Sequence, residues 1–316
     1  MDFEAKLSIL TSLYRSEKYL SKFLKHVSEQ SIFAESELIL VLNEGSREEL
    51  ETIRDFSEKY PQQVKLLHVE KVELLSASWN RAWREAKTSY VAIWNVDDRR
   101  RPDSLLEQVQ ALDEHPEWAL AYGDFVKVLN YGDEDGRYIH TPRYSLPLFR
   151  RAIPHGGAFL VFREDLHAEV GRFDEQLAIG PDFDMSVRIA MRGLQMGRIN
   201  ALLGYFTNEG LGLSTRTKFP SIEAELIFMR YGAYDNIRND GIGVKANFDI
   251  DNILVDGKWI ALTNYLPNLV RYRRMRKPLW VVGFFRNQLR TIIRKLGLLE
   301  AVHRLQKKLR EEISKQ

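Results

Sequence analysis

The alternation of short apolar runs with amphipathic stretches near the N-terminus constrains the fold more than any other feature. The apolar runs have the length of strands and lie at residues 7–12, 38–42, 64–69 and 90–94. The stretches between them carry apolar side chains at helical spacing and cover residues 17–29, 47–60 and 77–86. Strands that alternate with helices form parallel, doubly wound sheets. We therefore predict an α/β fold with a Rossmann-like, mostly parallel sheet and flanking helices.

The alternation continues, less regularly, as far as residue 215. We expect a helix over 104–114, a strand over 118–128, a hairpin turn over 130–136, and a helix over 181–191 that Gly193 caps. Residues 140–158 contain three prolines and a glycine pair, and we expect them to be irregular. The main domain should therefore cover residues 1–215, followed by a helical or irregular continuation over 216–269.

Polar residues follow three of the predicted strands directly. These segments are Ser12–Arg15, Asn43–Ser46 and Asn95–Asp98. In doubly wound sheets, ligands bind at the carboxyl ends of the strands. We therefore expect the three segments to meet at one edge of the sheet and to form a binding site.

The pair Asp97-Asp98 suggests what this site binds. Acids directly after a buried strand present oxygen atoms to a ligand crevice, and Mn²⁺ or Mg²⁺ takes oxygen ligands and bridges to substrate phosphates. One or two carboxylates and a diphosphate complete such a metal site. The alternative interpretation is that the pair caps the next helix or starts a turn.

Five segments follow one another along the chain: Leu7–Tyr14, Leu40–Ser46, Ser78–Ala82, Asn95–Asp98, and Val170–Glu175 together with Gly180–Arg188. In this order they resemble the motifs of glycosyltransferase family 2, whose members are inverting enzymes with the GT-A fold. The resemblance covers about residues 6–215. Ser12 stands where a proline is common, and four further positions depart from the family pattern: Asn43 and Asn95 stand where acids are usual, Trp79 replaces a basic residue, and Pro181 replaces a glutamate.

The resemblance implies a nucleotide-sugar donor site with a divalent metal, Mn²⁺ or Mg²⁺. Asp97 would be the chief metal ligand, and Asp98 would support it. The nucleotide-binding part would cover residues 1–102, and the acceptor and catalytic part residues 103–215. The implied donor and nucleotide-binding residues are Thr11, Ser12, Tyr14, Asn43, Glu44, Asn80, Asn95 and Asp97.

Asp182 stands at the position that matches the catalytic residue of the family motif. The resemblance implies that it takes the proton of the acceptor as general base. Because Asp182 also begins a helix, a capping role is the alternative. His155, Gly156 and Gly157 stand where an acceptor or sugar loop is expected, and a plain turn with a surface histidine fits them as well.

The implied function is transfer of a sugar, with inversion, from a nucleotide-diphosphate-sugar such as a UDP-sugar. The acceptor would be a glycan or a lipid-linked molecule in bacterial surface-polysaccharide synthesis. A non-catalytic binding or scaffold protein with a GT-A-like fold is the alternative, and the four departures favour it. A sugar-phosphate nucleotidyltransferase is a further alternative, but the sequence has no early glycine-rich phosphate loop.

Several other residues are interpreted as structural. Asp184 points to a different helix face from Asp182, and we expect it to pair with Arg188 at the i, i+4 spacing. We expect the three tryptophans nearest to the motifs to lie in the core rather than to stack on sugars. These are Trp79, Trp83 and Trp94. The run Arg99–Arg101 is predicted to be a solvated charge run rather than a diphosphate site.

The absence of cysteine excludes disulfides, thiolate catalysis and thiolate zinc sites, and it fits a reducing compartment. Residues 1–10 carry acids where a signal peptide carries a basic region followed by a long apolar stretch. We therefore expect a cytoplasmic protein.

The C-terminal segment 270–316 carries 14 Lys and Arg against 3 Asp and Glu, which is a net charge of +11. Because the whole chain has a net charge of +2, residues 1–269 have a net charge of −9. Its apolar run over residues 278–285 is far shorter than the ~20 residues that span a bilayer. We expect a basic amphipathic helix that lies on an anionic membrane surface, at the inner face of the plasma membrane. The alternative is a helix packed on the catalytic domain or on a second subunit of a homo-oligomer. Nucleic acid is not an expected partner, because the acidic body would repel it.

Overall fold

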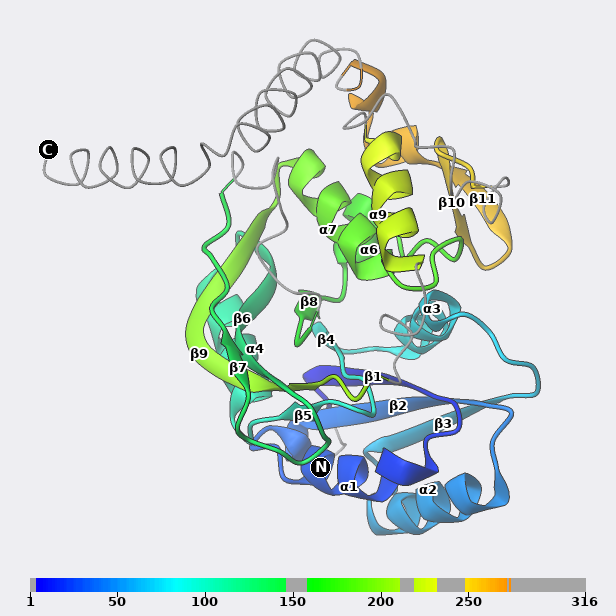
Figure 1. Cartoon of the computed structure of the whole chain (residues 1–316), viewed down its shortest axis with the longest axis vertical. Helices are drawn as coiled ribbons and strands as arrows, with labels where there is room; N and C mark the ends of the chain where they lie inside the picture. The colour runs from blue at the N-terminus through cyan, green and yellow to red at the C-terminus, as the bar shows by residue number, and fades with distance from the viewer. Residues whose placement is uncertain (1–3, 146–157, 211–218, 232–247, 272, 274–316) are drawn as a thin grey trace, which may run out of the picture.

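A curled sheet with helices on both faces carries the fold (Figure 1). The computed structural model describes residues 4–145, 158–210, 219–231, 248–271 and 273. Within these residues, nine strands form one sheet in the order β3-β2-β1-β4-β8-β6-β9-β5, with β7 paired to β6. The strands are β1 (Leu7–Leu13), β2 (Ser36–Asn43), β3 (Val64–Val69), β4 (Tyr90–Ile93), β5 (Arg99–Arg100), β6 (Trp118–Val128), β7 (Arg137–Ile139), β8 (Val161–Arg163) and β9 (Gln195–Thr207). The helices are α1 (Glu17–Ser28), α2 (Arg47–Lys59), α3 (Leu75–Glu85), α4 (Ser104–Glu114), α6 (Leu166–Val170), α7 (Pro181–Arg192) and α9 (Phe219–Arg230).

The first half of the sheet is the parallel repeat that the sequence predicts. β3, β2, β1 and β4 pair side by side in one direction, and Leu7–Leu13 of β1 matches Ser36–Leu42 of β2. The pairings of β6 and β9 give these strands the same direction, whereas β5, β7 and β8 run the opposite way. The prediction of a mostly parallel α/β sheet is therefore confirmed.

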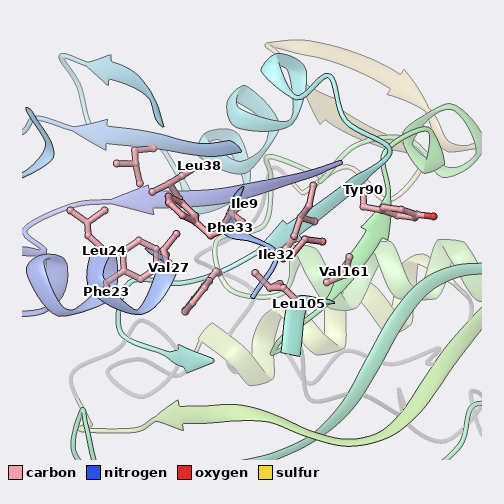
Figure 2. Close-up of a cluster of buried hydrophobic side chains, with 14 of the residues drawn as sticks. Ile9, Phe23, Leu24, Val27, Ile32, Phe33, Leu38, Tyr90, Leu105 and Val161 are labelled. Carbon is pink, nitrogen blue, oxygen red and sulfur yellow. The ribbon is translucent and has the colours of Figure 1, made fainter. Parts of the chain in front are cut away.

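The sheet is buried on both faces, which explains why its central strands are continuous apolar runs. On β1, Ile9 joins a core cluster with residues of α1, α2 and α4, whereas Leu10 joins a second cluster with residues of α3, α6 and α7. Figure 2 shows the first cluster, where Ile9 from β1 and Phe23 and Val27 from α1 belong to one buried group. Successive residues of a strand point to opposite faces, so one apolar run supplies both layers.

The second half of the sheet departs from the simple repeat. β8 lies antiparallel between β4 and β6, and the predicted hairpin is present as the antiparallel pair β6 and β7. β9 runs parallel to β6 and also pairs antiparallel with β5 at Arg99 and Arg100. Register shifts between β6 and β9 mark irregularities of the kind that bend strands. The bent β9 arches around the sheet toward β5 (Figure 1). The segment after β5 is joined to the segment after α1, because Ser31 N donates to the Pro102 carbonyl oxygen at 2.9 Å.

Two elements from the region after residue 215 pack on α7. They are α9 and the hairpin of β10 (Asn252–Val255) and β11 (Lys258–Ala261), and a short 3-10 helix (Leu262–Asn264) follows. Arg230 of α9 joins Asp174 and Asp184 at 2.7 and 2.9 Å, and all three side chains are fully buried. Asp184 also accepts from Arg188 Nε at 2.9 Å, so the predicted Asp184–Arg188 pair is confirmed within a larger ionic network.

The arginine run after β4 corrects a prediction, because it is not a solvated charge run. Arg100 is 2% exposed, and its Nη1 donates to Gln108 Oε1 at 2.8 Å. Burial lowers the pKa of Arg100 to about 9. Arg99 donates to Glu134, and Arg101 donates to the Leu202 carbonyl oxygen. Because β5 has only two residues, it makes few backbone hydrogen bonds, and these side chains help to hold it in place. The three tryptophans, in contrast, lie in the core as predicted: Trp79, Trp83 and Trp94.

Two sets of predictions fall on residues outside the described ones. These are the loop His155, Gly156 and Gly157, and the basic segment from residue 274 to 316. In the portion of the chain that the structure describes, no helix is both long and apolar enough to cross a membrane.

Candidate active site

The turn after β4 holds Asp97 and Asp98 at the carboxyl edge of the parallel strands. The Asp98 backbone N donates to the Asn95 carbonyl oxygen at 3.1 Å, which closes the turn. The indole Nε1 of buried Trp94 donates to the Asp98 carbonyl oxygen at 3.0 Å and attaches the turn to the core. The next helix, α4, begins at Ser104, with Asp103 as its N-cap residue. The pair therefore forms part of a turn but does not cap the helix.

Asp98 is buried without a cationic partner. Its side chain is 4% exposed, and Oδ1 accepts the Thr207 backbone N–H at 3.0 Å. Asn95 Nδ2 lies 3.5 Å from Oδ2. Burial and the charge of Asp97 raise the pKa of Asp98 well above its usual range. Such a carboxylate is unfavourable as an anion unless a positive charge is brought to it.

Asp97 also has a raised pKa and no cationic partner in the described part of the chain. It is partly buried, and burial followed by the charge of Glu209 raises its pKa. Among the described residues, neither Asp97 nor Asp98 forms an ion pair. The described residues also contain no group of three or more acids and histidines that could hold a metal alone. Mg²⁺ and Mn²⁺ sites in which one or two carboxylates act together with substrate phosphates need no such group, so the pair fits a cation bound with a diphosphate.

The ends of β1 and β2 supply the other polar groups of this edge. Thr11 is buried, and its Oγ1 has no hydrogen-bond partner among the described residues. Ser12 is partly buried, whereas Tyr14 is exposed and has the Arg15 guanidinium 5.0 Å from its ring centroid. Glu44 is also exposed. Arg15 and Glu44 have φ angles of 50° and 56°, in the left-handed region that residues other than glycine seldom adopt and that often occurs at functional sites.

Asn43 and Asn80, predicted as donor-site residues, lie inside the protein. Asn43 Nδ2 donates to the Leu13 carbonyl oxygen and to Ser78 Oγ, each at 3.2 Å, while its Oδ1 accepts the Glu73 backbone N–H at 3.1 Å. The Asn80 amide donates to the Phe173 carbonyl oxygen at 2.8 Å and accepts the Phe173 backbone N–H at 2.9 Å. Both amides therefore hold backbone segments that surround the site.

Asp182 is at the start of α7, which α3 helps to place. Ser76 Oγ of α3 donates to the Leu177 carbonyl oxygen at 2.8 Å, and Asn80 of α3 holds Phe173, as described above. Asp182 Oδ1 accepts the N–H of the adjacent Phe183 at 2.8 Å. Burial raises the pKa of Asp182 to about 6, and the charge of Glu223 adds to the effect.

Glu223 of α9 fixes the turn that leads into α7. Its carboxylate accepts three consecutive backbone N–H groups, those of Ala178, Ile179 and Gly180, at 3.0, 2.9 and 2.9 Å. Asp182 follows two residues later. The region after residue 215 is thus part of the support for the predicted catalytic base, which the sequence did not indicate.

A cluster around Glu209 was also missed from the sequence. Glu209 follows β9, and its Oε1 accepts the Tyr131 backbone N–H at 3.0 Å. Its Oε2 accepts from Tyr19 Oη at 2.8 Å and from Lys18 Nζ. The hydrogen bond from Lys18 is the largest effect on Glu209 and, with those from Tyr131 and Tyr19, lowers its pKa to about 2. The only sequence signal was weak: residues 203–206 and 210–215 flank Glu209 and resemble a segment of some family members.

The fold and the acidic turn at the carboxyl edge define the class of protein, a GT-A-fold glycosyltransferase. The model of the family described as "Glycosyl transferase family 2" matches residues 8–169, which is just over half of the chain. The chain therefore belongs to glycosyltransferase family 2, as its motifs predict.

Two sequence relatives are similar to part of the chain. The uncharacterized protein y4gI of Sinorhizobium fredii is 28% identical over 189 residues, or 59% of this chain and 20% of that protein. The protein named "Putative glycosyltransferase EpsE" of Bacillus subtilis is 27% identical over 115 residues, or 36% of this chain and 41% of that protein. The chain thus spans less than half the length of either relative.

Solved structures establish the fold. S. aureus TarS 1–349 in complex with UDP-GlcNAc has a TM-score of 0.56 at 19% identity and covers 71% of this chain and 64% of that one. Its complex with UDP has a TM-score of 0.53 at 18% identity, with 76% and 75% covered. The mannosyltransferase PcManGT from Pyrobaculum calidifontis, in complex with GDP-Man and Mn²⁺, has a TM-score of 0.51 at 15% identity, with 88% and 72% covered.

Proposed function

We propose that the chain transfers a sugar from a nucleotide-diphosphate-sugar to an acceptor hydroxyl, with inversion and with the help of a divalent metal. The observation that carries this proposal is the Asp97–Asp98 pair, in which Asp98 is buried and Asp97 partly buried, and which has no cationic partner among the described residues. Two adjacent acids shielded from water are expected to be retained where a cation binds during function. Family membership makes a nucleotide-sugar diphosphate the natural ligand to bring that cation.

The donor would lie along the carboxyl edge of β1, β2 and β4. The proposed contacting residues are Thr11, Ser12, Tyr14, Glu44, Asn95 and Asp97. Asn43 and Asn80 would position this edge rather than contact the nucleotide, because their amides already bind protein groups. UDP is the first nucleotide to test, since TarS, a structural neighbour, is seen with UDP and UDP-GlcNAc, and GDP is the second, since PcManGT is seen with GDP-Man.

The metal, Mn²⁺ or Mg²⁺, would be held by Asp97 with Asp98 in support. When bound, it would supply positive charge that stabilises the departing diphosphate. Its charge would also offset the desolvation and the negative charges that raise the pKa values of the two carboxylates.

Asp182 is the proposed general base. Its carboxylate would accept the proton of the acceptor hydroxyl while the hydroxyl oxygen bonds to the anomeric carbon and the bond from that carbon to the diphosphate breaks. A pKa of about 6 leaves Asp182 ionised at neutral pH and makes it a better base than an ordinary aspartate. Displacement on the face opposite to the leaving group inverts the anomeric centre.

The acceptor is proposed from the sequence. The net charge of +11 over residues 270–316 favours an anionic membrane surface and therefore a lipid-linked acceptor, or else a glycan, in surface-polysaccharide synthesis. Binding of the full chain to vesicles with and without anionic lipid, compared with a chain that ends at residue 273, tests the membrane attachment. Equal binding to both vesicle types would contradict it.

Calorimetric binding of UDP, GDP, CDP and dTDP, each with and without Mn²⁺, tests the proposed function. We expect metal-dependent binding of one diphosphate to the wild type, loss of that binding in Asp97→Ala, and loss of transfer in Asp182→Asn. Binding without turnover would favour the non-catalytic binding protein. Absence of binding to any diphosphate would overturn the donor site.

A further inference from the structure

The turn between β6 and β7 lies beside the Asp97–Asp98 turn because both are attached to the end of β9. Three consecutive residues there, Thr207 to Glu209, bind the Asp97–Asp98 turn and the β6–β7 hairpin. Thr207 N donates to Asp98 Oδ1 at 3.0 Å, and Asn208 N donates to the Val128 carbonyl oxygen at 2.9 Å. Glu209 Oε1 accepts the Tyr131 N–H at 3.0 Å. The end of β9 thus places Tyr131, which is more than 30 residues away from Asp98 in sequence, next to it in space.

The ring of Tyr131 is held in a defined position. It packs against Tyr19 and His26 of α1, with ring centroids 5.3 and 6.3 Å away. Glu209 binds the backbone of Tyr131 and the hydroxyl of Tyr19, so one carboxylate holds both tyrosines. A phenol fixed at its ring and at its backbone has little freedom to turn its hydroxyl away to solvent.

Two hydroxyl groups in this region are buried and lack a partner. The Oη atom of Tyr131 and the Oγ1 atom of Thr207 make no hydrogen bond to any described residue. Thr207 is 8% exposed. A buried hydroxyl without a hydrogen bond is unfavourable, and such groups in native proteins mark an absent partner.

The charges around Tyr131 limit what this partner is. Burial raises the pKa of Tyr131, the Arg99 guanidinium opposes this, and the charges of Asp98 and Asp97 raise the pKa further. The phenol therefore stays protonated beside the two acids. A neutral phenol is a poor ligand for a hard cation but a good hydrogen-bond donor, so the partner has acceptor oxygens.

We propose that the Tyr131 and Thr207 hydroxyls donate hydrogen bonds to the diphosphate of the donor, forming a wall of its site that no sequence motif indicates. This inference rests on the proposed function, because the diphosphate arrives at Asp97 and Asp98 with the cation. The carboxylates attract the cation, and the two hydroxyls bind phosphate oxygens without adding charge. The cation is then bound by anionic oxygens, and the phosphate oxygens by neutral hydrogen-bond donors.

The experiment measures binding by calorimetry with UDP and Mn²⁺, with GDP and Mn²⁺, and with Mn²⁺ alone. The variants are Tyr131→Phe and Thr207→Val, which remove the hydroxyls; valine keeps the backbone N–H that binds Asp98. Tyr144→Phe is the matched control. Tyr144 Oη is also buried without a partner among the described residues, but burial alone raises its pKa, with no carboxylate effect.

We expect Tyr131→Phe to weaken binding of the nucleoside diphosphate about tenfold or more, and Thr207→Val to weaken it several-fold. Binding of Mn²⁺ alone should stay at the wild-type value and the melting temperature should not fall in either variant, and Tyr144→Phe should bind the diphosphate like the wild type. Wild-type affinity in Tyr131→Phe would overturn the inference and leave the proposed function standing, as would an equal loss in Tyr144→Phe. A changed Mn²⁺ affinity or a lowered melting temperature would also overturn it, in favour of a metal or folding role. If the wild type binds neither UDP nor GDP, CDP and dTDP are tested in the same way, and binding of none of the four would overturn both the inference and the proposed function.

Discussion

Asp98 and Asp184 are both buried aspartates, at 4% and 0% exposed, but the two regions around them treat the negative charge in opposite ways. Burial opposes ionisation of Asp184, yet the charges of Arg230 and Arg188 outweigh it and lower its pKa. Burial and the charge of Asp97 raise the pKa of Asp98, and the hydrogen bonds from Thr207 and Asn95 and the charge of Arg100 do not offset them. Charge in the α7–α9 region is therefore neutralised within the protein, as in a structural support, whereas charge after β4 is left for a ligand to neutralise. This difference separates a structural acid from a candidate site.

The largest effect is expected from Asp182, which lies on the same helix as Asp184. We predict that Asp182→Asn lowers kcat by about 10²- to 10⁴-fold, the usual contribution of a general base, because an amide cannot take the acceptor proton. Donor binding by calorimetry should stay within twofold of the wild type. If kcat is unchanged, Asp182 is only part of the helix start, and the base must be sought elsewhere.

Removal of the cation that neutralises the α7–α9 region should destabilise the protein strongly. Arg230→Ala leaves Asp174 and Asp184 buried without their shared partner, and loss of one partner of a buried pair costs about 3–5 kcal/mol. Urea unfolding measures the free energy of unfolding.

Arg192→Ala is the matched control for that prediction. Arg192 is the last residue of α7, the helix that carries Asp184, and its pair with Glu169 is 40% and 52% exposed, so we expect a change of about 0–1 kcal/mol. Similar losses in the two variants would mean that burial does not distinguish these ion pairs.

The pH dependence of the rate should reveal the state of Asp182. Because only the ionised carboxylate accepts a proton, kcat should rise with pH up to about 6 and then level off, falling about tenfold for each pH unit below that value. Initial rates at saturating donor, measured from pH 4.5 to 8 in ~0.5-unit steps, check this. A rate that is already constant between about pH 5 and 8, as for an aspartate of ordinary pKa, would show that Asp182 is not desolvated in the working enzyme.

The smallest effect concerns the uncompensated charge after β4. Because burial makes the charged form of Asp98 unfavourable in the folded state, Asp98→Asn should raise the free energy of unfolding by about 1 kcal/mol at pH 7 without metal. Adding Mn²⁺ and UDP should stabilise the wild type more than the variant. Thermal unfolding with and without the two ligands tests both statements. If the variant is less stable than the wild type without metal, the charge of Asp98 is stabilised within the protein, as that of Asp184 is.

Local patterns were sufficient to predict the first half of the fold and the place of the candidate metal site. β1, β2, β3 and β4 lie where the apolar runs predict them, and Asp97 and Asp98 follow β4 at the sheet edge. The prediction of a solvated charge run was wrong for Arg100, because a charged residue has no sequence pattern that shows its burial. The family resemblance also did not show that the amides of Asn43 and Asn80 turn inward to bind backbone groups of distant segments.

The sequence by itself determined the α/β class, the family and the order of the motifs, because hydrophobic period and short motifs are encoded by neighbours along the chain. Only the tertiary structure decided which charges are neutralised and which are left for a ligand. That decision depends on β9, which binds Asp98 through Thr207 and Tyr131 through Glu209, and on α9, which brings Arg230 to Asp184. These contacts join residues that are between 46 and 109 positions apart, and no local pattern carries such pairing.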